Sequence, residues 1–248
     1  MKKVLTIDRG NNSVKGALFE SGRITKRWNA EGAVEEIAVW AAESKPDGAA
    51  VSSVIREWND LCVSALSDKG IGRIVIAGHD SPWPFTLDID SPASVGPDRL
   101  CAAAAVAAPG VGDAVIIDAG TAVTVDILSG GKFAGGAIMP GLELMLRSLS
   151  DGTSALPVVR IDKDDNGKSD ILPGRDTESA IRVGVLSAWR GGAADLVRLS
   201  LERFEITPPV FLTGGDAGLI VDTISPAPRL YPDLVLQGLN WVYNRQFG

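Results

Sequence analysis

Two stretches of this 248-residue chain follow one plan: TIDRGNNSVKGALF at residues 6–19 and IIDAGTAVTVDIL at residues 116–128. Each begins with an apolar run that predicts a buried strand. An aspartate, one further residue, a glycine and small polar residues come next, and a second strand follows. The aspartates, Asp8 and Asp118, stand 110 positions apart. The stretches therefore indicate an internal repeat of two similar halves.

The halves that we expect are 1–112 and 113–248, since domains usually contain about 100–200 residues. The element order expected in the first half is β-β-β-α-β-α-β, and the second half begins in the same way. This order is typical of an α/β fold in which a mixed sheet is flanked by helices. The polar stretch 162–170 predicts a mobile loop, and the chain is expected to close with a helix near 233–246.

Composition is that of an ordinary globular protein, with 45% hydrophobic and 22% charged residues. The net charge of −7 argues against a nucleic-acid-binding surface spread over the whole molecule. No apolar run reaches the roughly 18 residues of a membrane helix. The apolar run at 4–7 ends at Asp8 and is too short for a signal peptide. We therefore expect a cytoplasmic protein without a nucleic-acid or membrane partner.

Histidine and cysteine are scarce, which limits the metal chemistry open to the chain. His79 is the single histidine, so a multi-histidine metal site is excluded. Cys62 and Cys101 are the only cysteines, which excludes a disulfide scaffold. Glycine, by contrast, is abundant at 28 residues, and such an excess indicates tight turns or close approaches of the backbone.

The first repeated loop is well suited to nucleotide phosphates. A glycine turn lets backbone N–H groups face phosphate oxygens without an intervening Cβ. Asn11, Asn12 and Ser13 supply further donors, and Lys15 supplies a positive charge. Asp8 supplies an oxygen ligand of the kind that Mg²⁺ prefers. The same residues also fit an ordinary hairpin turn with an Asx hydrogen bond.

A second copy at the matching position strengthens the phosphate interpretation, because the two loops would grip a triphosphate from both sides of a cleft. Thr121 would contribute a hydroxyl there, and Asp118 a carboxylate for a cation. A third glycine loop, TGGDA at 213–217, follows a buried strand and permits close approach of a base or ribose. By itself it also fits a plain strand-to-helix turn with Asp216 as the cap.

These loops on two repeated halves resemble the nucleotide-binding superfamily shared by actin, hexokinase and the heat-shock chaperones. Within it, Gly96-Pro97-Asp98-Arg99 resembles the Gly-x-Asp-Arg signature of type III pantothenate kinases. The other motifs similar to that family occur in the family's order: DAGTAVTVD at 118–126, GGAIMPGL at 135–142, TSALP at 153–157, GRDTESAIRVG at 174–184, TGGDA at 213–217 and LVLQGL at 234–239.

The resemblance implies two ribonuclease-H-like or actin-like halves with an ATP cleft between them. It implies ATP-dependent phosphorylation of pantothenate to 4′-phosphopantothenate, the first step of coenzyme A biosynthesis. The implied cofactors are ATP with Mg²⁺ and a monovalent cation, K⁺ or NH₄⁺. The implied assembly is a homodimer with shared active sites.

Roles carry over by position. Asp98 matches the catalytic base, Asp118 the K⁺ ligand, and Thr177 a pantothenate contact supplied by the neighbouring subunit. The pantothenate-binding residues expected in the same way are Gly96, Pro97, Asp98, Arg99 and Thr177. The ATP-binding residues expected are Asp8, Arg9, Gly10, Asn11, Asn12, Ser13, Val14, Lys15, Thr121, Gly214 and Gly215, with Asp8 also the expected Mg²⁺ ligand.

Each assignment has a purely structural alternative. Asp98 stands in the first turn of a helix, where the dipole favours an acid. Arg99 also fits a surface ion pair, and Asp176 or Thr177 a helix cap. Two positions depart from the family's pattern: Asn12 stands where threonine is usual, and Ile89 where a tyrosine often contacts pantothenate.

Two other functions therefore stay open. One is a non-catalytic regulatory or binding relative of the same fold. The other is a kinase of the same superfamily that acts on another small hydroxylated substrate.

Overall fold

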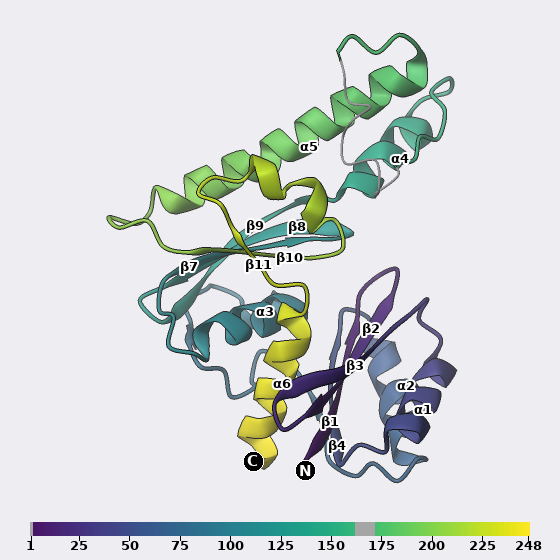
Figure 1. Ribbon diagram of the computed structural model, residues 1–248, viewed down its shortest axis with the longest axis vertical. Helices are drawn as coiled ribbons and strands as arrows, with labels where there is room; N and C mark the ends of the chain where they lie inside the picture. Colours follow the sequence, from purple (N-terminus) through teal and green to yellow (C-terminus); the bar gives the residue numbers. More distant parts are fainter. Residues whose placement is uncertain (1, 162–171) are drawn as a thin grey trace. The chain divides into compact units, whose positions relative to one another are not determined.

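The computed structural model describes residues 2–161 and 172–248, which form two compact units (Figure 1). Unit 1 comprises the chain up to Gly112 together with Ser129–Ala134 and Asp233–Gly248, and unit 2 comprises Asp113–Leu128 and Gly135–Pro232. The stretch 162–170, for which we expect a mobile loop, lies outside the described residues. The main difference from the expected halves is that the C-terminal residues belong to unit 1.

Unit 1 is built on a five-stranded mixed sheet of order β3-β2-β1-β4-β5. The strands are β1 (Lys3–Arg9), β2 (Val14–Glu20), β3 (Arg23–Ala30), β4 (Gly48–Ser53) and β5 (Ile74–Ile76). The first three strands are antiparallel neighbours, and β4 and β5 continue the sheet parallel to β1. The expected hairpin at 3–19 and the expected mixed sheet are confirmed.

Helices cover the sheet of unit 1 as α1 (Val34–Ser44), α2 (Arg56–Ser67), α3 (Pro97–Ala107) and α6 (Leu234–Phe247). Alternate residues of β1 point to opposite faces. Leu5 and Ile7 therefore pack with Ile37 and Trp40 of α1 and with Trp58 of α2. Helices α3 and α6 come later in the sequence, and both contact β4. They also pack extensively against each other. Burial on both faces explains why β1 reads as a continuous apolar run.

The C-terminal helix α6 approaches α3 unusually closely at Gly238. A Cβ placed on Gly238 would lie 1.9 Å from the carbonyl oxygen of Cys101. Just before α6, Asp233 accepts hydrogen bonds from the Arg27 guanidinium of β3, the shortest at 2.8 Å. These contacts explain why the chain beyond Asp233 belongs to unit 1 rather than to the second half.

Unit 2 repeats the central arrangement of unit 1. Its sheet strands are β7 (Ala114–Ala119), β8 (Ala122–Ser129), β9 (Lys132–Pro140), β10 (Val210–Thr213) and β11 (Arg229–Leu230). Strand β7 has an antiparallel neighbour, β8, on one side and a parallel neighbour, β10, on the other. Strand β1 has β2 and β4 in the same relation. The repeat detected in the sequence is therefore a repeat of topology.

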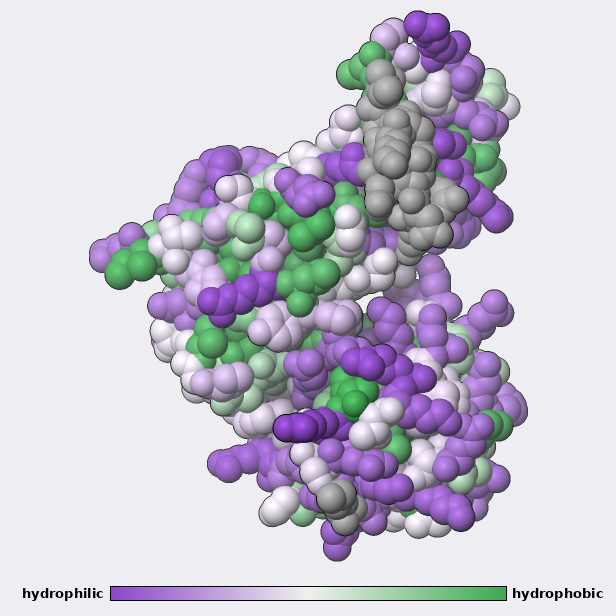
Figure 2. All heavy atoms as spheres, in the orientation of Figure 1, coloured by the Kyte–Doolittle hydropathy of each residue, from purple (hydrophilic) through white to green (hydrophobic). Residues whose placement is uncertain are grey.

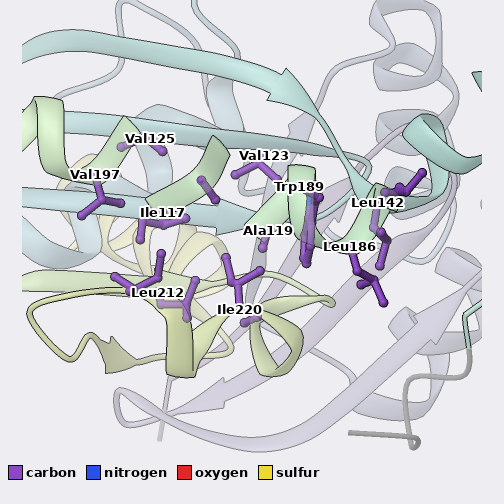
Figure 3. Packing of buried hydrophobic residues seen from close by; sticks show 14 of the residues in the cluster. Ile117, Ala119, Val123, Val125, Leu142, Leu186, Trp189, Val197, Leu212 and Ile220 are labelled. Atoms are coloured by element: carbon purple, nitrogen blue, oxygen red, sulfur yellow. The ribbon is translucent and has the colours of Figure 1, made fainter. Parts of the chain in front are cut away.

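The remaining elements of unit 2 are α4 (Leu142–Gly152), α5 (Thr177–Leu201) and two short 3-10 helices, η3 (Ala217–Leu219) and η4 (Val221–Thr223). Trp189 of α5 is fully buried at the centre of the core of this unit. Figure 3 shows it among Ala119, Val123 and Leu186. The long helix thus buries one face on the strands that carry the second repeated loop.

Two smaller elements complete unit 1: η1 (Pro92–Ser94) and β6 (Thr86–Leu87). Strand β6 pairs in parallel with Lys132 and Phe133, the first residues of β9. The sequence did not predict this short strand, which lies immediately after the proline-rich loop at 79–84.

Polar and apolar residues are interspersed over the visible face of each unit (Figure 2), in keeping with the charged share of 22%. Among the described residues, no helix has both the length and the apolar character needed to cross a membrane. Cys62 and Cys101 are buried free thiols.

Candidate active site

The first repeated loop is the four-residue turn between β1 and β2. The N–H of Gly10 donates to the carbonyl of Ser13 at 3.0 Å, which closes the turn, and Asn11 and Asn12 lie exposed at its tip. Asp8, partly buried near the end of β1, pairs across the hairpin with Lys15. The loop therefore presents the amide side chains of Asn11 and Asn12 outward, with an acidic and a basic residue where the two strands meet it.

The Arg9 side chain has a clear role within this loop. Its Nη1 donates to the carbonyl oxygens of Gly10 at 2.7 Å and of Ser13 at 3.3 Å. The guanidinium also fills the space beside Gly32, where an added Cβ would lie 2.8 Å from Cζ. Arg9 thus stabilises the turn, and the ATP contact that the resemblance implies for this residue stays a prediction.

Asp98 stands at the second position of α3, after Gly96 as the N-cap and Pro97 at the first helical position. Its Oδ1 accepts the backbone N–H of Arg99 at 2.9 Å. Burial raises the pKa of Asp98, and the Arg99 N–H and guanidinium oppose that shift. A Cβ on Gly96 would lie 2.4 Å from Oδ1 of Asp98, so the glycine provides the space that the carboxylate occupies.

Asp8 and Asp98 both lie within electrostatic reach of one residue of unit 1, Cys101. Both carboxylates act on the fully buried thiol of Cys101, whose pKa is raised well above its usual value by burial and then by these two charges. The sequence did not single out Cys101. Cys101 follows Asp98 by three residues, and this spacing puts both side chains on one face of a helix. The spacing was the signal in the sequence that could have linked Cys101 to the site.

The surroundings of Asp8 fit a divalent cation. Asp8 is paired in register with Ser52 of β4, whose hydroxyl is fully buried and hydrogen-bonds to no described residue. Carboxylate and hydroxyl oxygens are the ligand types that Mg²⁺ accepts, and Mg²⁺ keeps several waters and binds phosphates rather than requiring a complete protein cage. Among the described residues, no group of three or more His, Cys, Asp or Glu side chains is arranged to hold a metal ion.

Arg99 projects from the first turn of α3 over the ring of Phe133, with Cζ 5.8 Å from the ring centroid. Both residues belong to unit 1. Ile89, at the position where the resemblance leads one to expect a tyrosine, is half-buried and follows β6 by two residues.

In unit 2 the second repeated loop and the third glycine loop lie together. Gly214 follows β10 with φ +101°, and a Cβ there would lie 2.2 Å from the carbonyl oxygen of Ala119. The N–H of Asp216 donates to that same oxygen at 2.9 Å. Asp118 and Thr213 are register partners on β7 and β10. Asp118, Thr121, Gly214 and Gly215 therefore belong to one end of the sheet.

Thr177 begins α5 and is exposed. The cap of this helix is Asp176, whose side chain accepts the N–H of Ser179 at 2.8 Å while the Ser179 hydroxyl accepts the N–H of Asp176. This bond lowers the pKa of Asp176. Thr177 lines an open cavity of about 670 Å³ together with Leu149, Leu156 and Ile181. Of the two caps that the sequence left open, the structure selects Asp176.

Known proteins match the chain over its length. The sequence model of the family described as type III pantothenate kinase matches residues 4–198. The chain belongs to the type III pantothenate kinase family. A relative in that family, from Rhizorhabdus wittichii, is 30% identical over 257 residues, covering 98% of each chain.

Solved structures agree with this family in fold. A Baf family protein of Campylobacter jejuni has a TM-score of 0.64 at 18% identity, with 98% of each chain covered. A ROK hexokinase of Thermus thermophilus has a TM-score of 0.50 at 15% identity, again with 98% of each chain covered. The expected fold class, two mixed sheets flanked by helices, is confirmed. The cleft that we expect between the halves stays a prediction.

Proposed function

We propose that this chain transfers the γ-phosphoryl group of ATP to the 4′-hydroxyl of pantothenate, which yields 4′-phosphopantothenate and ADP. Membership of the type III pantothenate kinase family supports this reaction. The observation that carries the proposal is the Asp98 carboxylate at the start of α3, which the Arg99 N–H holds and Gly96 makes room for, in the same unit as Asp8. Asp8 belongs to the first phosphate loop and would hold the cation that accompanies the phosphates. Asp98 belongs to the Gly-x-Asp-Arg segment and would be the base.

In this proposal Asp98 accepts the proton of the pantothenate hydroxyl while that oxygen attacks phosphorus and the ADP oxygen leaves. Phosphoryl transfer has a loose transition state and depends chiefly on positioning and charge neutralisation. A carboxylate fixed by the Arg99 N–H and bounded by Gly96 is well placed to orient a hydroxyl. Burial raises the pKa of Asp98, which makes it a better proton acceptor than an exposed aspartate.

The other residues bind and neutralise. The N–H groups and side-chain amides of Asn11 and Asn12 bind phosphate oxygens, Gly10 leaves room for the phosphates beside the turn that its own N–H closes, and Lys15 adds a positive charge. Asp8 holds the magnesium ion, with Ser52 as a neighbouring hydroxyl. The bound magnesium ion supplies neutralisation of charge on the β- and γ-phosphates.

Unit 2 supplies the second phosphate loop and the adenosine contacts in this proposal. Thr121 binds a phosphate, and Gly214 and Gly215 pass close to the adenosine. Asp118 binds a monovalent cation, K⁺ or NH₄⁺, for which an acidic side chain at a strand end is a suitable oxygen ligand. Replacement of K⁺ by Na⁺ is expected to abolish turnover, and full activity in Na⁺ alone would contradict this role.

Thr177 contacts pantothenate in a neighbouring subunit, so the active form is a homodimer with shared active sites. Its exposure at the start of α5, beside an open cavity, is compatible with a contact outside its own chain. Light scattering measures the mass of the particle in solution. A monomer with full activity would refute the shared site.

Asp98→Asn tests the reaction. This variant is expected to abolish pantothenate phosphorylation and to keep ATP binding, which a fluorescent ATP analogue measures. A parallel panel of sugars separates pantothenate kinase from another kinase of the superfamily. A non-catalytic relative would bind ligands without releasing ADP, so near-normal turnover by Asp98→Asn and absent turnover by the wild type both contradict the proposal.

A further inference from the structure

A cation–aromatic contact joins the substrate segment to a strand far away in the sequence. The Arg99 guanidinium lies over the Phe133 ring at 5.8 Å. That distance is within the roughly 6 Å at which the ring quadrupole attracts a cation. Phe133 is fully buried, so its ring contacts protein and not solvent. Arg99 itself is only partly buried.

Phe133 is fixed in place by three separate contacts. Strand β6 pairs with it through Leu87, and the N–H of Asp88 donates to its carbonyl at 2.9 Å. Its ring packs against Phe85 with centroids 6.0 Å apart, and Phe85 in turn stacks on Trp83 at 5.8 Å. A ring held in this way makes a rigid platform for the long side chain that lies on it.

The support of the Phe133 ring comes from the proline-rich loop and from strand β6, which the sequence did not predict. The indole Nε1 of Trp83 donates to the carbonyl of Gly78 at 3.1 Å, which anchors the proline-rich loop. Strand β6 follows that loop directly and brings it alongside the start of β9. The segment 78–88 therefore supports Phe133 and, through it, Arg99.

We propose that Phe133 is the positioning residue for Arg99 and thereby sets the affinity for the carboxylate of the substrate. This inference rests on the proposed function and on the expected role of Arg99 as a pantothenate-binding residue, whose guanidinium is the suitable partner for the substrate carboxylate. A guanidinium that is attracted to a ring face does not use an N–H group as a hydrogen-bond donor to the ring. Its planar N–H groups match a carboxylate and can form two parallel hydrogen bonds with it. Holding the side chain on Phe133 before binding reduces the side-chain freedom lost when the carboxylate arrives.

The expected effect is on binding and not on chemistry. Phe133→Leu keeps an apolar side chain but removes the ring. The KM for pantothenate is then expected to rise about 5- to 30-fold, the span of a partly desolvated cation–π contact. The turnover number and the KM for ATP are expected to stay near the wild-type values, because Asp98 and the phosphate loops are untouched.

Panthenol, in which a hydroxymethyl group replaces the carboxylate, isolates the cause. It retains the hydroxyl that is phosphorylated but gives Arg99 no anion to bind. The same Phe133→Leu substitution is therefore expected to leave the KM for panthenol unchanged. A general loosening of the site would raise both values.

Phe211→Leu is the matched control, since it removes another buried ring that carries an arginine, Arg229 with Cζ at 5.7 Å, in unit 2. It is expected to lower thermal stability as Phe133→Leu does, with the pantothenate KM near wild type. If Phe133→Leu fails to fold, Phe133→Met, whose side chain adapts to irregular space, replaces it in the same assays.

The outcomes separate this inference from the reaction on which it rests. Wild-type turnover of pantothenate, with a KM raised for pantothenate alone in the Phe133 variant, supports it. Wild-type turnover with an unchanged pantothenate KM, or an equal rise for panthenol, overturns the inference and leaves the proposed function intact. A wild-type protein that does not phosphorylate pantothenate overturns the proposed function and this inference with it.

Discussion

Gly96→Ala is the substitution that most sharply tests the placement of the predicted base. The Cβ of alanine would lie 2.4 Å from Oδ1 of Asp98, whereas ordinary van der Waals contact begins at 3.4 Å. The carboxylate must therefore move by about 1 Å. The backbone has no reason to change, because Gly96 has φ −58° and ψ 134°, which alanine adopts readily.

The magnitude follows from that displacement. A misplacement of about 1 Å at a reacting group typically costs on the order of 100-fold in rate. That factor corresponds to about 2.7 kcal/mol of barrier. The fold loses little, since alanine is only about 1 kcal/mol or less worse than glycine as an N-cap, and the lower entropy of the unfolded chain partly offsets this.

The assay is steady-state ADP release with pantothenate as the varied substrate, run beside thermal unfolding. The turnover number is expected to fall about 100-fold while the KM for ATP and the unfolding midpoint stay near wild type. Gly72→Ala is the control, because its added Cβ meets no atom within 4 Å. Wild-type turnover by Gly96→Ala would refute the claim that the position of the Asp98 carboxylate determines the rate.

Three further predictions concern stability. Gly238→Ala puts a Cβ 1.9 Å from the Cys101 carbonyl and is expected to lower the unfolding free energy by about 2 kcal/mol or more in urea denaturation, since two helix backbones must separate; an unchanged midpoint would contradict the close contact of α3 with α6. Asp98→Asn is expected to raise stability at pH 7 while activity is lost, because burial raises the pKa of Asp98 and so disfavours its charged form in the folded state; a less stable variant would mean that its hydrogen bond outweighs desolvation. Asp176 has a lowered pKa because it accepts the Ser179 N–H, so its stabilisation is present above the unfolded pKa of about 3.9 and disappears as the pH falls through the lower folded pKa. Unfolding of Asp176→Ala against the wild type from pH 6 to pH 3 should show the difference shrinking with acid, and a constant difference would argue against the charged cap.

Local signals in the sequence predict much of the fold. The Asp-x-Gly loops locate both hairpins, because the backbone of a tight turn is determined by residues within a few positions of it. Pro97 after Gly96 predicts the start of α3, and the structure places both where the sequence does. The prediction of a mixed sheet follows from the element order and holds for both units.

Contacts between distant segments are what the sequence leaves open. Helix α6 packs on α3 because Gly238 lets two backbones meet, and no periodicity in either helix names the other as partner. Phe133 reads as one more apolar residue of a strand, and only the pairing with β6 puts its ring under Arg99.

Some site residues have a local role that their type does not reveal. The family resemblance implies an ATP contact for Arg9, and this stays a prediction. In the structure its donors go to the carbonyls of Gly10 and Ser13, because the hairpin turns the side chain back over its own loop. Asp98 and Asp8 both act electrostatically on Cys101, and this arrangement arises from tertiary packing that the motif alone does not specify.

The most direct test of the central claim is mass spectrometry of the products of the purified protein with ATP, Mg²⁺ and pantothenate in K⁺ buffer. Pantothenate is expected to gain one phosphoryl group and ADP to appear in equal amount, and neither product is expected to form with Asp98→Asn. Unmodified pantothenate after prolonged incubation of the folded wild-type protein, or equal phosphorylation by Asp98→Asn, would contradict it.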